Sequence, residues 1–511
     1  MRTINRRDFL NFSSLLLGAT LFPGSQRILT EQNARKPNII ILVFDAMSAN
    51  HLSVYGYPRR TTPNFERFAE RAIVYHSNYA AANFTSPGTA TLLTGMHPWK
   101  HRAFNIGGLV TRRLANNNLF HLLEDEYYSV GFSQNVLANK LLSELISAID
   151  WKLPPEAFSS GLKKILYSSF FPEDDFVSYD AFDEYLARTD FDAKRITGSL
   201  SLGFLNSIFS AHARETPDKD YPWGRPLASQ AFYFDNKKVV MEIAQTILGL
   251  EQTSPFIGYF HFYAPHEPYT PYKDFVGIFK DMPLVKKPYH KLSYDKLPQR
   301  TMKEHRDHYD EYIANVDAEF GNLLDLLEGS GILNDSYLIL ASDHGEMFER
   351  GEVGHNTALL SESVLRTPLI ISRPGQQQRI DVHSQTCNTD IVPTLLHLTG
   401  ARIPESLDGR ILPMLGGQED PDRPIFSLDA KENSAFYPLR TATIALNKKD
   451  YKLIHYIGYK KYDQQFELYN LHEDPNELTN LFDTDSVVAS QMKDELLTAL
   501  DEANRPFQRS R

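Results

Sequence analysis

An unbroken apolar run near the start of the chain constrains the fold more than any other stretch. Residues 38–44 read Asn-Ile-Ile-Ile-Leu-Val-Phe, and Asp45 follows directly. Because polar residues do not alternate with the apolar ones, the run is typical of a parallel strand that is covered on both faces. Open α/β sheets bind their ligands at the carboxyl ends of such strands. We therefore expect a central strand over 37–45 with Asp45 at the functional edge of the sheet; capping of the following turn is the alternative role of Asp45.

The order of the predicted elements indicates an α/β fold. Helical spacing of apolar residues predicts helices over 236–250 and 304–327, and the apolar runs 255–262 and 337–341 predict strands. This alternation is typical of a large doubly wound mixed sheet that is flanked by helices. After about residue 400, hairpin-like runs and a last helix over 487–503 predict a small antiparallel sheet beside the main domain.

The amino-terminal segment has the pattern of an export signal. Arg6 and Arg7 precede the apolar run 15–22, which is too short to span a bilayer as a helix of the mature protein. We interpret residues 1–30 as a twin-arginine signal peptide. We therefore expect an exported protein, periplasmic or extracellular, with anchoring by an uncleaved signal as an alternative. No later stretch has the pattern of a transmembrane segment.

The remaining chain divides into two predicted parts. Residues 36–400 form the main α/β domain, in which 150–225 mix aromatic and acidic residues and are expected to be an insertion or lid. Residues 401–511 form a carboxy-terminal α+β subdomain. The net charge of −11 and the lack of a basic stripe exclude a nucleic-acid partner. The single cysteine, Cys387, excludes an intrachain disulfide and is expected to pack as a small buried group.

A loop that turns into a helix carries the most distinctive chemistry. In residues 83–95, Thr85 suits the N-cap of a helix, Pro87 falls in its first turn and Gly95 can end it. The free N–H groups and the dipole at a helix amino terminus attract anions and favour an ionised oxygen. An ordinary capped helix is the alternative interpretation. What singles out Thr85 is its combination with acids and a histidine elsewhere in the chain.

Asp45, Thr85, Asp343 and His344 together can form one metal site. Two carboxylates and one imidazole carry a charge of about −2, which offsets a divalent ion and leaves coordination room for a hydroxyl. A bound dication lowers the pKa of a ligated water from about 15.7 to about 7, and an alkoxide from Thr85 needs a similar shift.

Nine stretches of the chain occur in the order found in one known family. The chain resembles the sulfatase branch of the alkaline-phosphatase superfamily over nearly its whole mature length. The matching stretches are residues 38–45, 55–57 with 62–64, 85–95, 266–269, 317–324, 342–346, 366–370, 390–396, and 468–471 with 474–477.

The resemblance implies an alkaline-phosphatase-like fold and a role for each candidate residue. Thr85 lies where the family has its catalytic nucleophile, and the metal ligands are Asp45, Asp343 and His344. His266 and His355 lie where the family holds the ester oxyanion or protonates the leaving group, for which a histidine is suited. His101 and Lys100 are further candidates for substrate binding.

Three departures from the family pattern refine this expectation. Thr85 cannot give the formylglycine that common sulfatases make from cysteine or serine, so we expect no formylglycine. Thr89 replaces the usual arginine, and Ala46 replaces the second of two paired acids. In its threonine, the chain is similar to phosphodiesterases, phosphoethanolamine transferases and lipoteichoic acid synthases of the superfamily. The lost acid and the imidazole of His344 favour manganese or zinc over calcium or magnesium as the one metal ion.

The sequence therefore predicts an exported, metal-dependent hydrolase that cleaves sulfate esters or phosphate diesters through a covalent Thr85 intermediate. Both substrate classes are monoanions, which suit a site without the arginine better than a phosphate monoester does. The substrate would be a small molecule, a glycan or a lipid ester. Two alternatives are a phospho-group transferase acting on envelope glycans or lipids, and a non-catalytic binding protein that kept the fold.

Overall fold

The computed structural model describes residues 36–159, 219–228, 232–253, 255–279, 282–460, 462 and 465–508. The predicted signal peptide and most of the predicted insertion at 150–225 lie outside the described residues.

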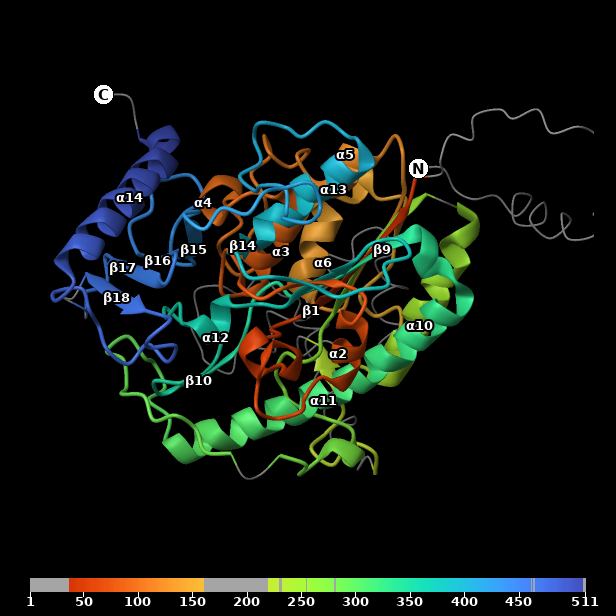
Figure 1. The fold of residues 1–511 in the computed structure, drawn as a ribbon, viewed down its shortest axis with the longest axis horizontal. Helices are drawn as coiled ribbons and strands as arrows, with labels where there is room; N and C mark the ends of the chain where they lie inside the picture. Colours follow the sequence, from red (N-terminus) through yellow and green to blue (C-terminus); the bar gives the residue numbers. More distant parts are fainter. Residues whose placement is uncertain are drawn as a thin grey trace, which may run out of the picture. The chain divides into compact units, whose positions relative to one another are not determined.

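A large mixed sheet forms the centre of the described chain (Figure 1). Its central strand β1 pairs in parallel with β8 and β9, and β12 is antiparallel to both of its neighbours. The predicted α/β fold with a large mixed sheet is therefore confirmed. From one edge to the other, the strands are β13 (Ile380–Val382), β2 (Ile73–Tyr75), β12 (Leu369–Ser372), β9 (Ser336–Ala341), β1 (Asn38–Phe44), β8 (Phe256–Phe262), β4 (Tyr128–Ser133) and β5 (Trp151–Lys152).

Helices cover both faces of this sheet, which explains why the sequence of β1 is apolar throughout. Ile40, Leu42 and Phe44 pack with one group of helices, and Ile39 and Ile41 pack with the other. Figure 1 shows α2 and α11 on one side of β1 and α3, α6 and α13 on the other. The first group comprises α2 (Pro63–Ala69), α10 (Asn236–Gly249) and α11 (Gln299–Ser330); the second comprises α3 (Thr85–Thr94), α5 (Leu119–Leu123), α6 (Val136–Glu144) and α13 (Ile391–Thr399).

The amino terminus of α3 differs from the prediction in one respect. Phe84 is the N-cap, Thr85 is the first helical residue, and the Thr85 hydroxyl makes no capping hydrogen bond. The predicted N-cap role is therefore wrong, because the hydroxyl contacts side chains of the neighbouring strand ends instead. Gly88 brings the helix close to the chain after β9, since a Cβ at this position would lie 2.5 Å from the carbonyl oxygen of Asp343. Gly95 ends α3 with a φ of 66°.

A small antiparallel sheet follows the main sheet in the chain, as predicted. Its strands run in the order β15 (Ile425–Asp429), β16 (Ala442–Lys448), β17 (Tyr451–Ile457) and β18 (Phe466–Asn470), and helix α14 (Ser486–Asn504) packs on it. The remaining short elements are β3 (Asn78–Tyr79) with β14 (Thr386–Cys387), β10 (Met347–Glu349) with β11 (Glu352–Gly354), β6 (Leu227–Ala228) with β7 (Phe232–Tyr233), α4 (Pro98–His101) and α12 (Glu362–Leu365).

Two further expectations concern single features of the chain. Cys387 is buried and unpaired, as predicted. Among the described residues, none of the helices combines the length and the apolar character that a membrane-spanning segment requires.

Lys452 in β17 joins the small sheet to α12, and its removal should be costly. Its fully buried Nζ donates to Glu362 Oε1 at 3.1 Å and to Glu477 Oε1 at 2.9 Å. Lys452→Met leaves two buried carboxylates without their cation, so we expect a loss of about 3–5 kcal/mol in the free energy of unfolding. The matched variant Lys448→Met breaks the half-exposed pair with Glu495 and should cost less than about 1 kcal/mol. Denaturant unfolding of both variants measures the difference; equal losses would contradict this role.

Glu467 should make the stability of this region depend on acid pH. Burial alone would raise its pKa, but hydrogen bonds from His290, Tyr462 and Tyr456 outweigh burial and lower the pKa to about 2. Because the folded pKa lies below the ordinary value of 4.5, the contribution is complete above about pH 4.5 and disappears as the pH falls toward 2. It amounts to roughly 3 kcal/mol.

The variant Glu467→Gln should therefore be less stable than the wild type at neutral pH, and the difference should shrink between about pH 4.5 and 2. Urea unfolding of both proteins across this range is the measurement. Glu495→Gln, which alters the half-exposed pair with Lys448, is the control and should show little pH dependence. A constant difference between wild type and Glu467→Gln would refute the prediction.

Candidate functional site

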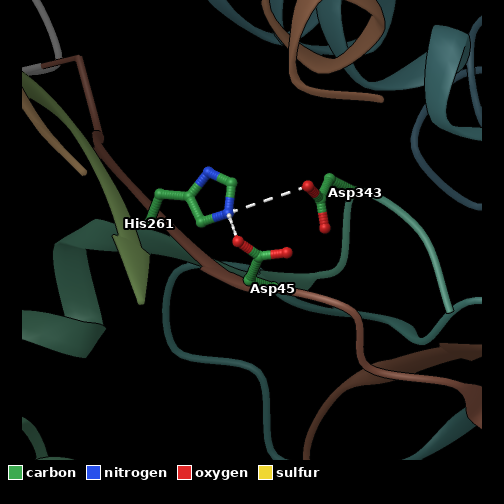
Figure 2. A group of neighbouring side chains, drawn as sticks. All are labelled: Asp45, His261 and Asp343. Carbon is green, nitrogen blue, oxygen red and sulfur yellow. Dashed lines mark ion pairs between the residues drawn. The ribbon is translucent and has the colours of Figure 1, made fainter. Parts of the chain in front are cut away.

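Residues from four parallel strands meet at the carboxyl edge of the main sheet. Asp45 follows β1 and Asp343 follows β9. His261 is the second-last residue of β8, and Asn135 follows β4. Parallel strands bring their carboxyl ends to the same edge, where α/β folds place their functional groups. Figure 2 shows the His261 ring directed toward the carboxylates of Asp45 and Asp343.

The acidic and imidazole groups at this edge are fully buried and close together. His344 Nε2 lies 3.4 Å from Asp45 Oδ1 and 3.5 Å from Asp343 Oδ2. His261 Nε2 lies 3.6 Å from Asp45 Oδ2 and 3.8 Å from Asp343 Oδ2. We refer to Asp45, Asp343, His344 and His261 as the central cluster.

Thr85 lies beside the central cluster at the amino terminus of α3. Its Oγ1 is 3.4 Å from His344 Nε2 and accepts a hydrogen bond from Asn135 Nδ2 at 3.3 Å. The same amide nitrogen donates to Asp45 Oδ2 at 2.5 Å. Asn135 is itself fixed, because its Oδ1 accepts from the backbone N–H of Leu137 at the start of α6. The structure thus brings together the four residues that the sequence assigned to one metal site.

The ring of His344 is oriented by its other nitrogen. Nδ1 lies 2.9 Å from the carbonyl oxygen of Gly345, which can only accept, so the proton is on Nδ1. The lone pair of the neutral ring is then on Nε2 and faces the carboxylates. Burial lowers the pKa of His344, but Asp343 and Asp45 outweigh burial and raise it to about 9. The two carboxylates therefore attract positive charge to this position.

Three buried polar atoms of the central cluster have no hydrogen-bond partner among the described residues: Asp45 Oδ1, Asp343 Oδ2 and His261 Nε2. Buried polar atoms without partners are unfavourable, and those of a charged group especially so. These three residues lie close enough to ligate a single ion. One divalent cation would satisfy all three atoms and neutralise the two carboxylates, so the residues present fit such an ion.

His355 and His266 line the adjoining part of the site. The ring centre of His355 lies 4.3 Å from that of His344 and 4.7 Å from that of His266. His355 Nδ1 is 3.0 Å from Glu346 Oε1, and His266 Nδ1 donates to the carbonyl oxygen of Glu267 at 2.7 Å. Burial, followed by the nearby histidines, lowers the pKa of His355 well below its ordinary value. His355 is therefore neutral near pH 7.

The structure joins the two predicted substrate-binding residues to other partners. Lys100 Nζ donates to Asp408 Oδ1 at 2.6 Å. The buried His101 accepts from the N–H of Ala103 at 3.0 Å, its Nε2 is 3.3 Å from Thr91 Oγ1, and burial lowers its pKa to about 3. His101 is therefore an uncharged packing residue against α3. The neighbouring Arg102 donates to backbone carbonyls in the loop between β15 and β16.

Sequence analysis missed two residues of the site, His261 and Asn135. A signal was present for each. His261 interrupts the apolar run of β8 one residue before its end, and Asn135 follows Ser133 and Gln134 at the end of β4, a strand that was not predicted. The register explains the position of His261, because it lies level with Val43 of β1 and Ser133 of β4.

Comparison with protein families gives two matches. The model of the family described as sulfatase matches residues 37–401. The model described as N-sulphoglucosamine sulphohydrolase, C-terminal, matches residues 351–504. The first match covers both acids of the central cluster, both of its histidines and Thr85.

Individual relatives agree with these matches. A choline-sulfatase of Rhizobium meliloti is 24% identical over 87% of this chain and 82% of that protein. An N-acetylgalactosamine-6-sulfatase of Rattus norvegicus is 24% identical over 76% of this chain and 68% of that protein.

Solved structures show the same fold at lower identity. The phosphonate monoester hydrolase of Agrobacterium radiobacter superposes with a TM-score of 0.65 at 20% identity, covering 92% of this chain and 96% of that one. A 2-O GAG sulfatase superposes with a TM-score of 0.63 at 17% identity, covering 92% of both chains. The match over residues 37–401, together with this fold, establishes that the chain belongs to the sulfatase family of ester hydrolases.

Proposed function

We propose that the chain is a metal-dependent hydrolase of sulfate esters or phosphate diesters that uses Thr85 as its nucleophile. The observation that carries the proposal is the position of the Thr85 hydroxyl, 3.4 Å from His344 Nε2 and hydrogen-bonded to Asn135, at the amino terminus of a helix. A hydroxyl in such a place combines a nucleophile with an anion-binding helix end.

The residues of the site have two roles, to bind the metal ion and to orient the Thr85 hydroxyl. Asp45, Asp343 and His344 would hold one divalent cation, for which manganese or zinc suits the donors better than calcium or magnesium. Such an ion, when bound, acidifies a ligated hydroxyl and polarises the ester. Asn135 holds the Thr85 hydroxyl and the Asp45 carboxylate in one orientation. Formylglycine is not involved, because threonine has a Cβ methyl group in place of the hydrogen that the aldehyde requires.

The reaction proceeds in two displacements. Thr85 Oγ1 releases its proton to water and attacks the sulfur or phosphorus, and the bond to the leaving alcohol breaks. The alcohol takes its proton from His266, and the neutral His355, which lies between His266 and His344, lines the same side of the site. Water then attacks the sulfo- or phospho-threonine and restores the hydroxyl. Transfer to a glycan or lipid hydroxyl instead of water would make the protein a transferase, and the same intermediate serves both outcomes.

The location of the protein is part of this proposal. The paired arginines and the apolar run in residues 1–30 support export to the periplasm or the extracellular space. An ester of an extracellular glycan, lipid or small molecule is the corresponding substrate.

Thr85→Ala should abolish turnover. Loss of the nucleophile lowers kcat by roughly 1,000-fold or more, whereas Thr85→Ser keeps a hydroxyl and should keep measurable activity. Ser86→Ala is the matched control, because this adjacent buried hydroxyl accepts from the N–H of Gly107 and not from Asn135 or His344. The measurement is steady-state hydrolysis, with mass spectrometry of quenched enzyme to find the sulfo or phospho group on Thr85. Normal turnover by Thr85→Ala would rule out the nucleophile assignment.

The site should prefer singly charged esters. Lys100 is paired with Asp408, His101 is uncharged and Arg102 binds backbone carbonyls, so none of the three offsets a second negative charge beside Thr85. We expect kcat/KM for a phosphate diester or a sulfate ester with a nitrophenolate leaving group to exceed that of the phosphate monoester. The expected ratio is at least about tenfold, because one uncompensated charge nearby costs more than about 1.4 kcal/mol.

A preference for the phosphate monoester would contradict this view of the site. Lys100→Met tests the main alternative. If Lys100 contacts substrate, the variant changes the ratio of kcat/KM values; if Lys100 serves Asp408, the ratio is unchanged and only stability falls.

A further inference from the structure

We propose that His261 is a ligand of the same metal ion, so that the centre consists of two carboxylates and two imidazoles with the Thr85 hydroxyl beside them. This inference rests on the metal dependence proposed above. It adds a fourth ligand to Asp45, Asp343 and His344, and it changes which metals the site selects.

The backbone of β8 fixes the His261 side chain in the site. Ile257, Tyr259 and His261 alternate with the phenylalanines of β8, so they point toward the face of the sheet that α3 covers. Thr85 begins α3 on that same face. The imidazole is fully buried and its partner strands on both sides are parallel, so its position has little freedom.

The distances around His261 Nε2 are those of donors that share an ion. At 3.6 and 3.8 Å from the carboxylate oxygens of Asp45 and Asp343, the nitrogen is beyond hydrogen-bond range, and no other described residue forms a hydrogen bond with it. Donors that lie about 2.0–2.4 Å from one cation are roughly 3–4 Å from one another. The 3.4 and 3.5 Å separations of His344 Nε2 from the same two carboxylates fall in the same range.

The other ring nitrogen of His261 has the partner that a metal-binding histidine needs. Nδ1 lies 3.3 Å from the hydroxyl of Tyr259. Nε2, on the other side of the ring, is directed toward Asp45 and Asp343 (Figure 2). A phenol hydroxyl can accept as well as donate, so the Tyr259 oxygen can accept from Nδ1–H. The lone pair is then on Nε2 and faces the carboxylates, as in other sites where the second nitrogen is held by a hydrogen bond.

A second imidazole determines which metals bind well. Calcium and magnesium prefer oxygen donors, whereas zinc, manganese and cobalt accept nitrogen donors. The alternative is that His261 lies beside Asp45 and Asp343 without contacting the metal ion. That alternative predicts one imidazole on the metal, and it predicts no change in metal preference when the residue is replaced.

The test counts imidazoles on the metal without measuring turnover. Metal-free protein is loaded with cobalt(II), and proton NMR records the exchangeable imidazole N–H signals that the paramagnetic ion shifts. The Nδ1–H groups of His344 and His261 are both buried and hydrogen-bonded, which slows their exchange. We expect two shifted signals in the wild type and one in His261→Gln.

Calorimetric titration supplies the second readout. In His261→Gln, zinc affinity should fall by more than the roughly 10–100-fold that loss of a ligand's hydrogen-bond partner costs, and calcium affinity should change little. Tyr259→Phe should keep both signals with a smaller loss. His355→Gln is the matched control, a buried histidine beside the cluster that keeps wild-type zinc affinity.

The outcomes separate this inference from the proposed function. One shifted signal in the wild type, or unchanged zinc affinity in His261→Gln, overturns the role of His261 and leaves the proposed hydrolase intact. A wild type that binds no divalent metal contradicts the proposed metal dependence itself. If His261→Gln does not fold, the signal count of the wild type decides alone.

Discussion

The approach of two buried carboxylates, Asp45 and Asp343, is the constraint that the rest of the site satisfies. Both follow strands that are parallel neighbours, and neither is accessible to solvent. Burial and the charge of Asp45 raise the pKa of Asp343. Burial would also raise the pKa of Asp45, but the histidines around it lower it well below its ordinary value. Such a pair persists only where positive charge or hydrogen-bond donors surround it.

The backbone around the acids is adapted to the same need. Ala46 adopts a φ of 59°, in the left-handed region, and its N–H donates to Asp343 Oδ1 at 3.3 Å. The N–H of His344 donates to the same oxygen at 3.0 Å. Two backbone donors therefore hold one side of Asp343, and its other oxygen is left facing His344 and His261. In the turn after β1, Ala46 thus contributes a backbone N–H donor at the position where the resemblance leads us to expect an acidic residue.

The sequence predicted the fold well because the strongest signals are local. The apolar run of β1, the helical spacing of α11 and the hairpin pattern after residue 400 are each visible in one stretch of chain. Asp45, Thr85, Asp343 and His344 were also predicted, and the structure places them together, although their roles as nucleophile and ligands remain proposals. Each of these residues belongs to a short motif at the end of a strand or the start of a helix. Such motifs can be recognised without knowing how the strands pair.

The failures arise where position depends on pairing between distant strands. Strand β4 carries Ser129 and Gly131 among its apolar residues, so its pattern is weak, and Asn135 was missed with it. His261 lies within an apolar strand pattern, and only the register with β1 shows that it reaches the acids. The predicted N-cap role of Thr85 was wrong because it rested on local sequence alone. The hydroxyl instead contacts Asn135 and His344, which lie far away in the sequence.

The buried Lys452 also bears on how such a protein can evolve. Its partner Glu362 begins α12, and the carbonyls of Ser363 and Val364 in that helix accept from the N–H groups of Glu346 and Gly345, directly after His344. The short helix α12 is thus hydrogen-bonded on one side to the carboxy-terminal sheet and on the other to the backbone that follows a histidine of the central cluster. Recombination could therefore not exchange the carboxy-terminal sheet freely between relatives. A replacement sheet would need a lysine at the position of Lys452 to hold Glu362, and with it α12, in place.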